Sequence, residues 1–457
     1  MKTIEVDVLV CGGGMSGLAC AAFAAEAGAK VLVVEKQADV GGSSNYSAGM
    51  FWAPQTYNKL RSWVPEGDPV LQKAWLSDYL PAVQWMRENG VPTADRFDGI
   101  MTIGIGFPIK IPHLHNLHRK RIQSSKTHSD IFTNTSVELP RFANYILRSQ
   151  SQSGSFGYGG FQGSPGMTSK YLGQGGDNIF VRSNRGSVGD GLKLAIESGA
   201  GTSRGMNTYY GHLLAAPLRA EDVDPKDYLP LAQYRQRFAD ETTGDEIINQ
   251  YLAKQPKRRG FILFNEKTRL EHCVTALFPN AGDIDRLQKA REHGCNVRSA
   301  STLDGLMDIL HGWGVNYVQA RRTIEEYDRV VRLGDKGISL DAPIGRACLT
   351  PTPLVDGEGP FYAMEVQPSI TFTYGGVAID AKGHALTPDK SRIPGLLVAG
   401  VDAGGFSNLG YAGGLALAFV TGLWAAREVA SDLGLPEPRL PPADIRDGED
   451  KPIQGRL

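Results

Sequence analysis

The start of the chain alternates short apolar runs with an alanine-rich stretch. Residues 6–11 are mostly apolar and lead into a triple glycine at 12–14, which predicts a buried strand followed by a turn. Residues 16–27 are rich in alanine and end at Gly28, which predicts a helix with a glycine stop. Residues 29–35 form a second apolar run, so the pattern predicts a complete β-α-β unit.

Further along, the pattern predicts a mixture of helices, strands and loops. Residues 41–54 are rich in glycine and serine and are predicted to form a loop, whereas residues 69–88 are predicted to form a helix. Residues 206–370 carry longer mixed segments with charges and prolines, which indicates a second domain inserted into the first. The other predicted elements are a helix at 189–198, a hairpin at 375–386, a strand at 396–401 and a helix at 413–430.

Composition narrows the class of protein. The chain has 457 residues, a formal charge of −1 and 41% hydrophobic residues, which is enough for a core and suggests two or three domains. The even charge balance predicts no nucleic-acid or membrane-surface partner. No apolar run reaches the roughly 18 residues of a membrane helix, and the acidic start does not resemble a signal peptide, so we expect a cytoplasmic protein. Five cysteines without a CxxC spacing predict reduced thiols.

A glycine motif follows the first predicted strand. Gly12, Gly14 and Gly17 stand in a GxGxxG pattern, and Glu35 ends the next predicted strand. In this setting the first glycine allows a tight turn, the second lets the backbone approach a pyrophosphate, and the third lets helix and strand pack closely. Glu35 can accept hydrogen bonds from ribose hydroxyls. The motif predicts a dinucleotide site, and the alternative is a glycine-rich turn without a ligand.

Segments beyond this unit resemble one flavoprotein family. Lys36 and the stretch Gly41-Gly42-Ser43-Ser44 follow Glu35 closely, and this resembles the FAD-dependent fumarate reductase and 3-ketosteroid dehydrogenase superfamily. Four later segments resemble the family in the same order, namely 159–163, 189–191 with 197–200, 359–363, and 393–400 with Asp402 and 413–414. The chain departs from the family between 130 and 159 and before 237–241, where the family's strands are shortened.

The resemblance implies an α/β fold with a doubly wound, Rossmann-like FAD-binding domain at 1–205 and 371–457 and an inserted α+β substrate-capping domain at 206–370. It implies non-covalent FAD as the cofactor. The active site is expected where open α/β sheets bind ligands, at the carboxyl ends of the strands. The implied FAD-binding residues are Gly12, Gly14, Met15, Ser16, Gly17, Glu35, Lys36, Gly41, Gly42, Ser43, Ser44, Gly160, Asp190, Asp402, Gly414 and Leu415.

Two positions bear on the reaction. Phe372 stands where dicarboxylate-reducing members of the family carry a His, and Tyr411 stands where they carry an Arg. The negative charges of a bound dicarboxylate would therefore be poorly compensated in this site. Tyr411 resembles the tyrosine with which ketosteroid dehydrogenases, together with a backbone N–H, hold a substrate carbonyl. The resemblance implies hydride transfer between flavin N5 and a C–C bond next to a carbonyl of a neutral, rather apolar molecule, with Phe372 and Leu415 lining the site. The alternative for Tyr411 is a packed aromatic beside the flavin.

Other residues are weaker catalytic candidates. Arg269 resembles the Arg proton donor of fumarate reduction, and the alternative is a surface charge on a short helix. His212 falls near the family's substrate-domain His, with a structural or surface role as the alternative. Glu241 matches the acid of an Arg-Phe-x-x-Glu motif and either lies in the site or braces it. A tyrosine base is left open among Tyr209, Tyr210, Tyr234 and Tyr251.

A histidine-rich stretch invites a metal or phosphate interpretation. His113, His115 and His118 stand beside the basic run 119–121. The spacing fits no reliable zinc pattern, and no further ligands are near in the sequence. We predict a solvated loop, with an anion contact or a metal site as alternatives.

The electron acceptor is expected to be a separate molecule. No second GxGxxG motif follows a predicted strand, so the sequence predicts no NAD(P) domain, and substrate and acceptor, or oxygen, would use one flavin face in turn. The rival functions are a fumarate-reductase-like enoate reductase, a flavin monooxygenase or oxidase, and a non-catalytic FAD-binding protein. Rapid reaction of reduced flavin with oxygen would mark an oxidase.

Overall fold

The computed structural model describes residues 4–100, 103–137, 153–156, 159–219, 221–224, 232–233, 245–276, 282–333, 353–355 and 359–443. These residues fall into two compact units. Unit 1 holds the described residues up to Asp177, those of 183–210 and those from Phe372 onward, and unit 2 holds those of 178–182 and 211–371. The domain boundaries predicted from the sequence lie at 205/206 and 370/371. The described residues contain no helix long and apolar enough to cross a membrane.

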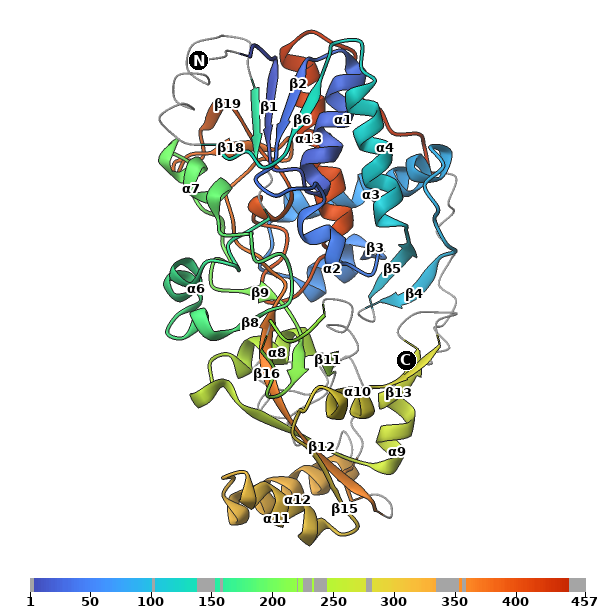
Figure 1. Cartoon of the computed structure of the whole chain (residues 1–457), viewed down its shortest axis with the longest axis vertical. Helices are drawn as coiled ribbons and strands as arrows, with labels where there is room; N and C mark the ends of the chain where they lie inside the picture. Colours follow the sequence, from blue (N-terminus) through green and yellow to red (C-terminus); the bar gives the residue numbers. More distant parts are fainter. Residues whose placement is uncertain are drawn as a thin grey trace. The chain divides into compact units, whose positions relative to one another are not determined.

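Unit 1 is built on a six-stranded sheet with the order β18-β19-β7-β1-β2-β6 (Figure 1). Every neighbouring pair is parallel except β18 and β19, which are antiparallel. The predicted strand-helix-strand start of the chain is confirmed, and β7 lies between β1 and β19 in the middle of the sheet. The strands are β1 (Val8–Cys11), β2 (Val31–Val34), β6 (Asp130–Phe132), β7 (Ser153–Phe156), β18 (His384–Leu386) and β19 (Arg392–Val398).

Helix α1 (Met15–Ala27) is the central helix of unit 1, and it packs against α13 (Leu415–Asp432) and α4 (Ile111–Gln123) (Figure 1). Alanine and glycine line α1, so its neighbours approach closely: a Cβ on Gly422 of α13 would lie 2.3 Å from the carbonyl oxygen of Ser16. Helix α1 ends at Gly28, whose φ of 112° is the left-handed conformation that a glycine stop requires.

The predicted helix at 69–88 is confirmed as α3 (Pro69–Glu88). Its start is set by local chemistry, because the Asp68 carboxylate accepts hydrogen bonds from two backbone N–H groups of the first turn and proline occupies the first helical position. The other helices of unit 1 are α2 (Tyr57–Trp63), α6 (Pro165–Leu172) and α7 (Asp190–Glu197), with the short 3₁₀ turns η1 (Gly42–Tyr46) and η7 (Gly400–Asp402). A further 3₁₀ turn, η2 (Gly176–Asn178), has its last residue in unit 2.

Two predicted loops are wrong. Residues 41–54 contain η1 and then strand β3 (Met50–Pro54), which pairs with β5 (Gly104–Pro108), itself paired with β4 (Phe97–Ile100). All residues of β3 after the half-buried Met50 are buried, and that burial outweighs the loop preference of the glycine and serine before the strand. The solvated loop predicted around the three histidines is helix α4, because its apolar and histidine side chains recur every three or four residues on one buried face.

Unit 2 is an α+β unit around strand β16 (Phe361–Ile370). Its sheet has the order β11-β10-β16-β12, and β15 and β8 also pair with β16. The remaining strands are β8 (Phe180–Val181), β10 (Leu213–Ala215), β11 (Ala232–Gln233), β12 (Gly260–Asn265), β13 (Val274–Ala276), β14 (Asp283–Asp285) and β15 (Val297–Ala300). The helices are α8 (Asp245–Leu252), η5 (Pro256–Arg258), α9 (Glu266–Thr268), η6 (Arg269–Cys273), α10 (Arg286–Glu292), α11 (Leu303–Gly312) and α12 (Tyr317–Leu333).

Candidate functional site

The glycine turn after β1 has the geometry of a close backbone approach. Gly12 adopts a φ of 99°, and its N–H donates to the carbonyl oxygen of Val34 at 2.8 Å. A Cβ on Gly17 would lie 1.9 Å from the carbonyl oxygen of Gly12, so no larger residue fits between α1 and the turn. Gly14 precedes α1, whose first residues Met15 and Ser16 are buried. The first-turn N–H groups of α1 therefore lie beside the turn, as a pyrophosphate site requires.

Glu35 is held at the end of β2 by the same turn. Its carboxylate is buried and accepts hydrogen bonds from the backbone N–H of Gly13 at 2.8 Å and of Gln37 at 2.9 Å. An ionised carboxylate offers about four acceptor positions, so two remain beyond these bonds. This position is compatible with the predicted ribose contact, which stays a prediction.

The stretch from Gly41 to Ser44 lies directly against the glycine turn. The N–H of Gly41 donates to the carbonyl oxygen of Gly13 at 2.7 Å, and Gly41 and Gly42 have φ values of 119° and 52°. The Ser43 hydroxyl is buried and has no hydrogen-bond partner among the described residues. A buried hydroxyl left without a partner is costly, so this atom fits a ligand that would bond to it.

A second set of such atoms surrounds Gly160. The Gly160 N–H donates to the buried carboxylate of Asp402 at 3.2 Å, which joins two predicted FAD residues that are far apart in sequence. A Cβ on Gly160 would lie 2.8 Å from Oγ1 of Thr373 and 2.9 Å from Oε1 of Gln162. Both of these oxygens are buried without a partner within the described part of the chain. The donor and acceptor set of unit 1 thus fits FAD, and the individual contacts remain predictions.

Two further predicted FAD residues bind each other. Nζ of Lys36 lies 2.5 Å from Oδ2 of Asp190, at the start of α7. Beside them, the side-chain amides of Gln37 and Asn184 exchange two hydrogen bonds of 2.8 and 3.1 Å. The end of β2 is therefore tied to the loop before α7 by one ion pair and one amide pair.

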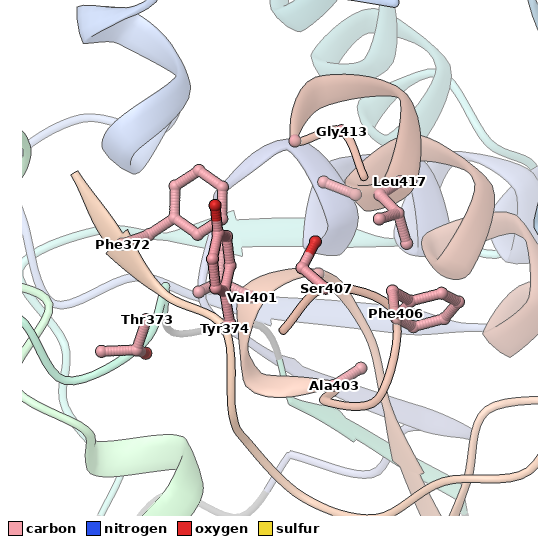
Figure 2. Close-up of a pocket in the computed structure, with 12 residues that line it drawn as sticks. Phe372, Thr373, Tyr374, Val401, Ala403, Phe406, Ser407, Gly413 and Leu417 are labelled. Carbon is pink, nitrogen blue, oxygen red and sulfur yellow. The ribbon is translucent and has the colours of Figure 1, made fainter. Parts of the chain in front are cut away.

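An aromatic pocket opens at the start of α13. Figure 2 shows the residues that line it, with Phe372 and Tyr374 on one side and Phe406 and Leu417 on the other, and none of the 12 lining residues carries a charge. The lining residues are Phe372, Thr373, Tyr374, Gly400, Val401, Ala403, Phe406, Ser407, Gly413, Gly414, Leu417 and Ala418. The predicted substrate-lining residue Phe372 is among them, and Leu415 is a half-buried neighbour in the first turn of the helix.

Tyr411 belongs to an aromatic cluster beside this pocket. Its ring stacks on Tyr210 with centroids 4.0 Å apart, and Trp52 meets it edge-on at 5.1 Å. A Cβ on Gly414 would lie 2.7 Å from the Tyr411 hydroxyl, so that hydroxyl lies against the N-terminal end of α13. Tyr210 comes from β9 (Tyr209–Tyr210), which pairs with β17 (Phe372–Thr373). Sequence reasoning missed Trp52 because no motif marks it.

The other catalytic candidates lie outside this cluster. Arg269 belongs to unit 2 and is bound by Glu266 at 2.8 and 2.9 Å and by Asp285 at 3.0 Å. Hydrogen bonds from Arg269 and from the Tyr362 hydroxyl lower the pKa of Glu266 to about 2, and the same ion pair raises the pKa of Arg269. Arg269 is thus a paired charge in this structure, and its role as a proton donor stays a prediction.

His212 also belongs to unit 2 and is buried, so a surface role for it is wrong. Its backbone bonds to Ser369 of β16. Among the tyrosines left open as the base, Tyr210 joins the Tyr411 cluster, Tyr209 is buried on β9 and Tyr251 packs against the core of unit 2. Glu241 and Tyr234 lie outside the described residues.

The histidines of α4 divide by exposure. His113 is exposed, whereas His115 and His118 are buried. Burial lowers the pKa of both buried rings, to about 4 for His115. Over the ranges that the structure describes, no group of three His, Cys, Asp or Glu side chains is placed to hold a metal ion.

Comparison with known proteins gives the family. The profile of the FAD binding domain family matches residues 7–107 and 242–417. NADH:fumarate oxidoreductase of Klebsiella pneumoniae (strain 342) is 25% identical over 90% of this chain, which spans 46% of that protein's length. Vinyl phenol reductase of Lactiplantibacillus plantarum is 24% identical, and the match covers 89% of this chain and 91% of that protein.

A much shorter match has a higher identity. Over 53 residues the chain is 49% identical to 4-oxocyclohex-2-ene-1-carboxylate 5-dehydrogenase of Sinomonas cyclohexanicum, which is 12% of this chain and 9% of that protein. The named activities of these relatives agree with the expectation of an FAD-dependent oxidoreductase.

Solved structures share the fold. 3-Ketosteroid Δ1-dehydrogenase from Sterolibacterium denitrificans, in complex with 1,4-androstadiene-3,17-dione, matches with a TM-score of 0.68 at 17% identity, covering 94% of this chain and all of the other. The open conformation of a flavocytochrome c3 fumarate reductase matches with a TM-score of 0.63 at 20% identity, covering 93% of this chain and 78% of the other. The predicted fold class and the FAD cofactor are confirmed. The fold of this chain is the one found in a fumarate reductase and in a 3-ketosteroid dehydrogenase, and the chain belongs to the FAD binding domain family.

Proposed function

We propose that this FAD-binding protein is a dehydrogenase or reductase acting on a C–C bond next to a carbonyl of a neutral, rather apolar molecule. The observation that carries the proposal is the pocket at the start of α13, because none of its lining residues is charged. A dicarboxylate buried there would lose its hydration without gaining a compensating cation. An apolar cyclic ketone or enone would instead exchange water for aromatic surface.

Tyr411 is the group that would polarise the carbonyl. Its hydroxyl lies against Gly414, beside the first backbone N–H groups of α13, which have no partner within the helix. A phenol and a helix N-terminal N–H aimed at one oxygen form an oxyanion-type site, which stabilises the charge that develops on a carbonyl as the neighbouring C–H bond changes. Bound FAD would supply the two-electron hydride chemistry.

The aromatic neighbours would fix the orientation of Tyr411. Stacking on Tyr210 and the edge contact with Trp52 leave its ring little rotational freedom, so the hydroxyl is pre-positioned. Tyr210 presents a second phenol next to it and is our choice for the proton-transferring tyrosine.

Two relatives are named for cyclic substrates. Vinyl phenol is a neutral ring without a carbonyl, whereas 4-oxocyclohex-2-ene-1-carboxylate is a cyclic enone that carries one carboxylate, so these names support a cyclic substrate and not its neutrality. The fumarate reductases among the relatives keep a dicarboxylate as the rival substrate, and Arg269 is the residue that would favour it. An oxidase, or a protein that binds FAD without catalysis, is a further outcome that the experiment below separates.

The test is anaerobic reduction of the purified flavoprotein, followed by its visible spectrum. Saturated cyclic ketones should bleach the flavin band of the oxidised protein, and cyclic enones should restore it in the reduced protein, whereas dicarboxylates should do neither. The variant Tyr411→Phe should slow the reaction by about 10²-fold or more, as loss of an oxyanion donor does. Tyr57→Phe is the matched control, because it removes a phenol hydroxyl whose hydrogen bond, to the carbonyl oxygen of Pro69, is exposed to solvent.

Three outcomes would contradict the proposal. Near-wild-type kinetics of Tyr411→Phe would remove that hydroxyl from the reaction. Reoxidation by fumarate and not by enones would transfer the assignment to the dicarboxylate reductases. A flavin that no ketone or enone affects would leave an oxidase, if oxygen reoxidises it rapidly, or a non-catalytic protein.

A further inference from the structure

Helix α4 reaches the predicted FAD stretch through one buried contact. Nε2 of His115 lies 3.1 Å from the hydroxyl oxygen of Ser44. The same hydroxyl lies 2.5 Å from the carbonyl oxygen of Gly41, to which the Ser44 N–H also donates at 3.2 Å. These bonds close the turn at the start of η1, where Gly41 and Gly42 hold left-handed conformations.

The proton count at Ser44 sets the direction of the bond. A serine hydroxyl has one proton, and the shorter contact commits it to the carbonyl of Gly41. The imidazole must therefore donate its Nε2 proton to Ser44. Burial lowers the pKa of His115 to about 4, against the opposing effect of the Asp39 carboxylate, so the ring is neutral at pH 7 and has a single N–H to give.

The helix that carries His115 is fixed by its own packing. One turn along, His118 is fully buried and its ring stacks on Trp85 at 5.7 Å with an interplanar angle of 12°. Leu114 and Ile122 are also fully buried, and α4 packs on α1. His115 therefore lies on a rigid helix. A hydrogen bond can hold a glycine-rich loop in one conformation only if its other partner is fixed in this way.

We propose that His115 is a positioning residue for FAD: by donating to Ser44 it holds the turn that presents the Ser43 hydroxyl and the neighbouring backbone to the cofactor. The Ser43 hydroxyl has no partner among the described residues, so its orientation is decided by the turn that Ser44 closes. The inference rests on the predicted FAD role of 41–44 and does not depend on which substrate the protein uses.

The test compares three variants by titration of the apoprotein with FAD, followed by the quenching of FAD fluorescence and the shape of the long-wavelength flavin band. His115→Phe keeps a buried ring and removes the N–H, so FAD should bind about tenfold more weakly, the loss expected when a buried hydrogen-bond partner is left unsatisfied. His115→Gln offers an amide N–H at the same reach and should restore most of the affinity and the wild-type band. His113→Phe, on the exposed side of α4, is the matched control and should bind FAD as the wild type does.

Wild-type FAD affinity and spectrum in His115→Phe would overturn the proposal, and so would a His115→Gln variant that is as weak as His115→Phe. If His115→Phe does not fold, Ser44→Ala decides, because it removes the acceptor of the hydrogen bond and should also weaken FAD binding about tenfold. Unchanged FAD affinity in Ser44→Ala would contradict the proposed role of the His115–Ser44 hydrogen bond. No substrate enters these measurements, so a wrong substrate class would leave the result unaffected.

Discussion

Gly17 offers a direct test of how tightly α1 lies against the glycine turn. A Cβ at this position would lie 1.9 Å from the carbonyl oxygen of Gly12, whereas real Cβ atoms essentially never come closer than 3.0 Å. The nearest obstacle is the backbone of Gly12, which has no side chain that could rotate away. In Gly17→Ala, α1 and the turn must therefore separate by about 1 Å.

The magnitude follows from two opposing effects. Forcing an extra carbon into a packed interior costs about 1–3 kcal/mol, and an immobile backbone neighbour places this site near about 3 kcal/mol. Replacing glycine by alanine inside a helix returns about 0.5–1 kcal/mol. We expect a net loss of about 2 kcal/mol, or about 4–8 °C in Tm for a unit of this size. The FAD affinity should fall as well, because the displaced turn is the predicted pyrophosphate site.

The assay is thermal unfolding of the apoprotein together with the FAD content of the purified holoprotein. Gly166→Ala is the matched control, because Gly166 lies in helix α6 and a Cβ there would have no atom within 4 Å. That variant should keep its FAD and gain up to about 1 kcal/mol. If Gly17→Ala melts at or above the wild-type temperature and keeps FAD, the close approach of α1 to the turn does not hold in solution.

Two further predictions concern stability. Asp68→Ala removes the carboxylate that caps α3, so the free energy of unfolding should fall by about 1 kcal/mol in urea titrations, with the exposed Asp95→Ala as a neutral control. The pKa of Glu266 is lowered to about 2 by hydrogen bonds led by that from Arg269, so this carboxylate stabilises the fold above its unfolded pKa near 4.5 and the effect is lost as the pH falls towards 2. The stability advantage of the wild type over Glu266→Gln should therefore shrink below about pH 4.5; an advantage constant from pH 7 to 3 would contradict the ion-pair assignment.

The sequence predicted well where the signal is local. Helix α3 is marked by its own cap and proline, and α1 by alanine and the stop at Gly28. The close approach of Gly17 to Gly12 could also be predicted from the first glycine motif, because the two residues are only five positions apart in the sequence. Each of these features is decided by a few neighbouring residues.

The sequence did not predict elements whose structure depends on residues far away in the chain. Strand β7 is Ser-Gly-Ser-Phe, which shows no apolar run, yet it lies between β1 and β19 because two parallel neighbours satisfy its backbone. The sequence of α4 predicts a solvated loop because its histidines and basic residues mask the spacing of the apolar positions. Which histidines are buried is decided by the packing of α4 on α1, which the sequence does not reveal.

The candidate site also has a part that depends on local motifs, the predicted FAD loops, and a part that depends on distant segments, the aromatic cluster. The turns and close approaches at the predicted FAD residues could be predicted because each comes from a motif carried by one segment, and their contacts with FAD stay predictions. The aromatic cluster around Tyr411 could not be predicted as a cluster, because Trp52, Tyr210 and Phe372 lie on β3, β9 and β17 and meet only in the fold. If the substrate class is set by this cluster, it is a property of several segments at once. Exchanging Tyr411 alone for the arginine that the resemblance implies at this position in dicarboxylate reductases would place a charge among aromatic rings, beside a pocket whose lining residues carry no charge, so we expect this single substitution not to convert one specificity into the other.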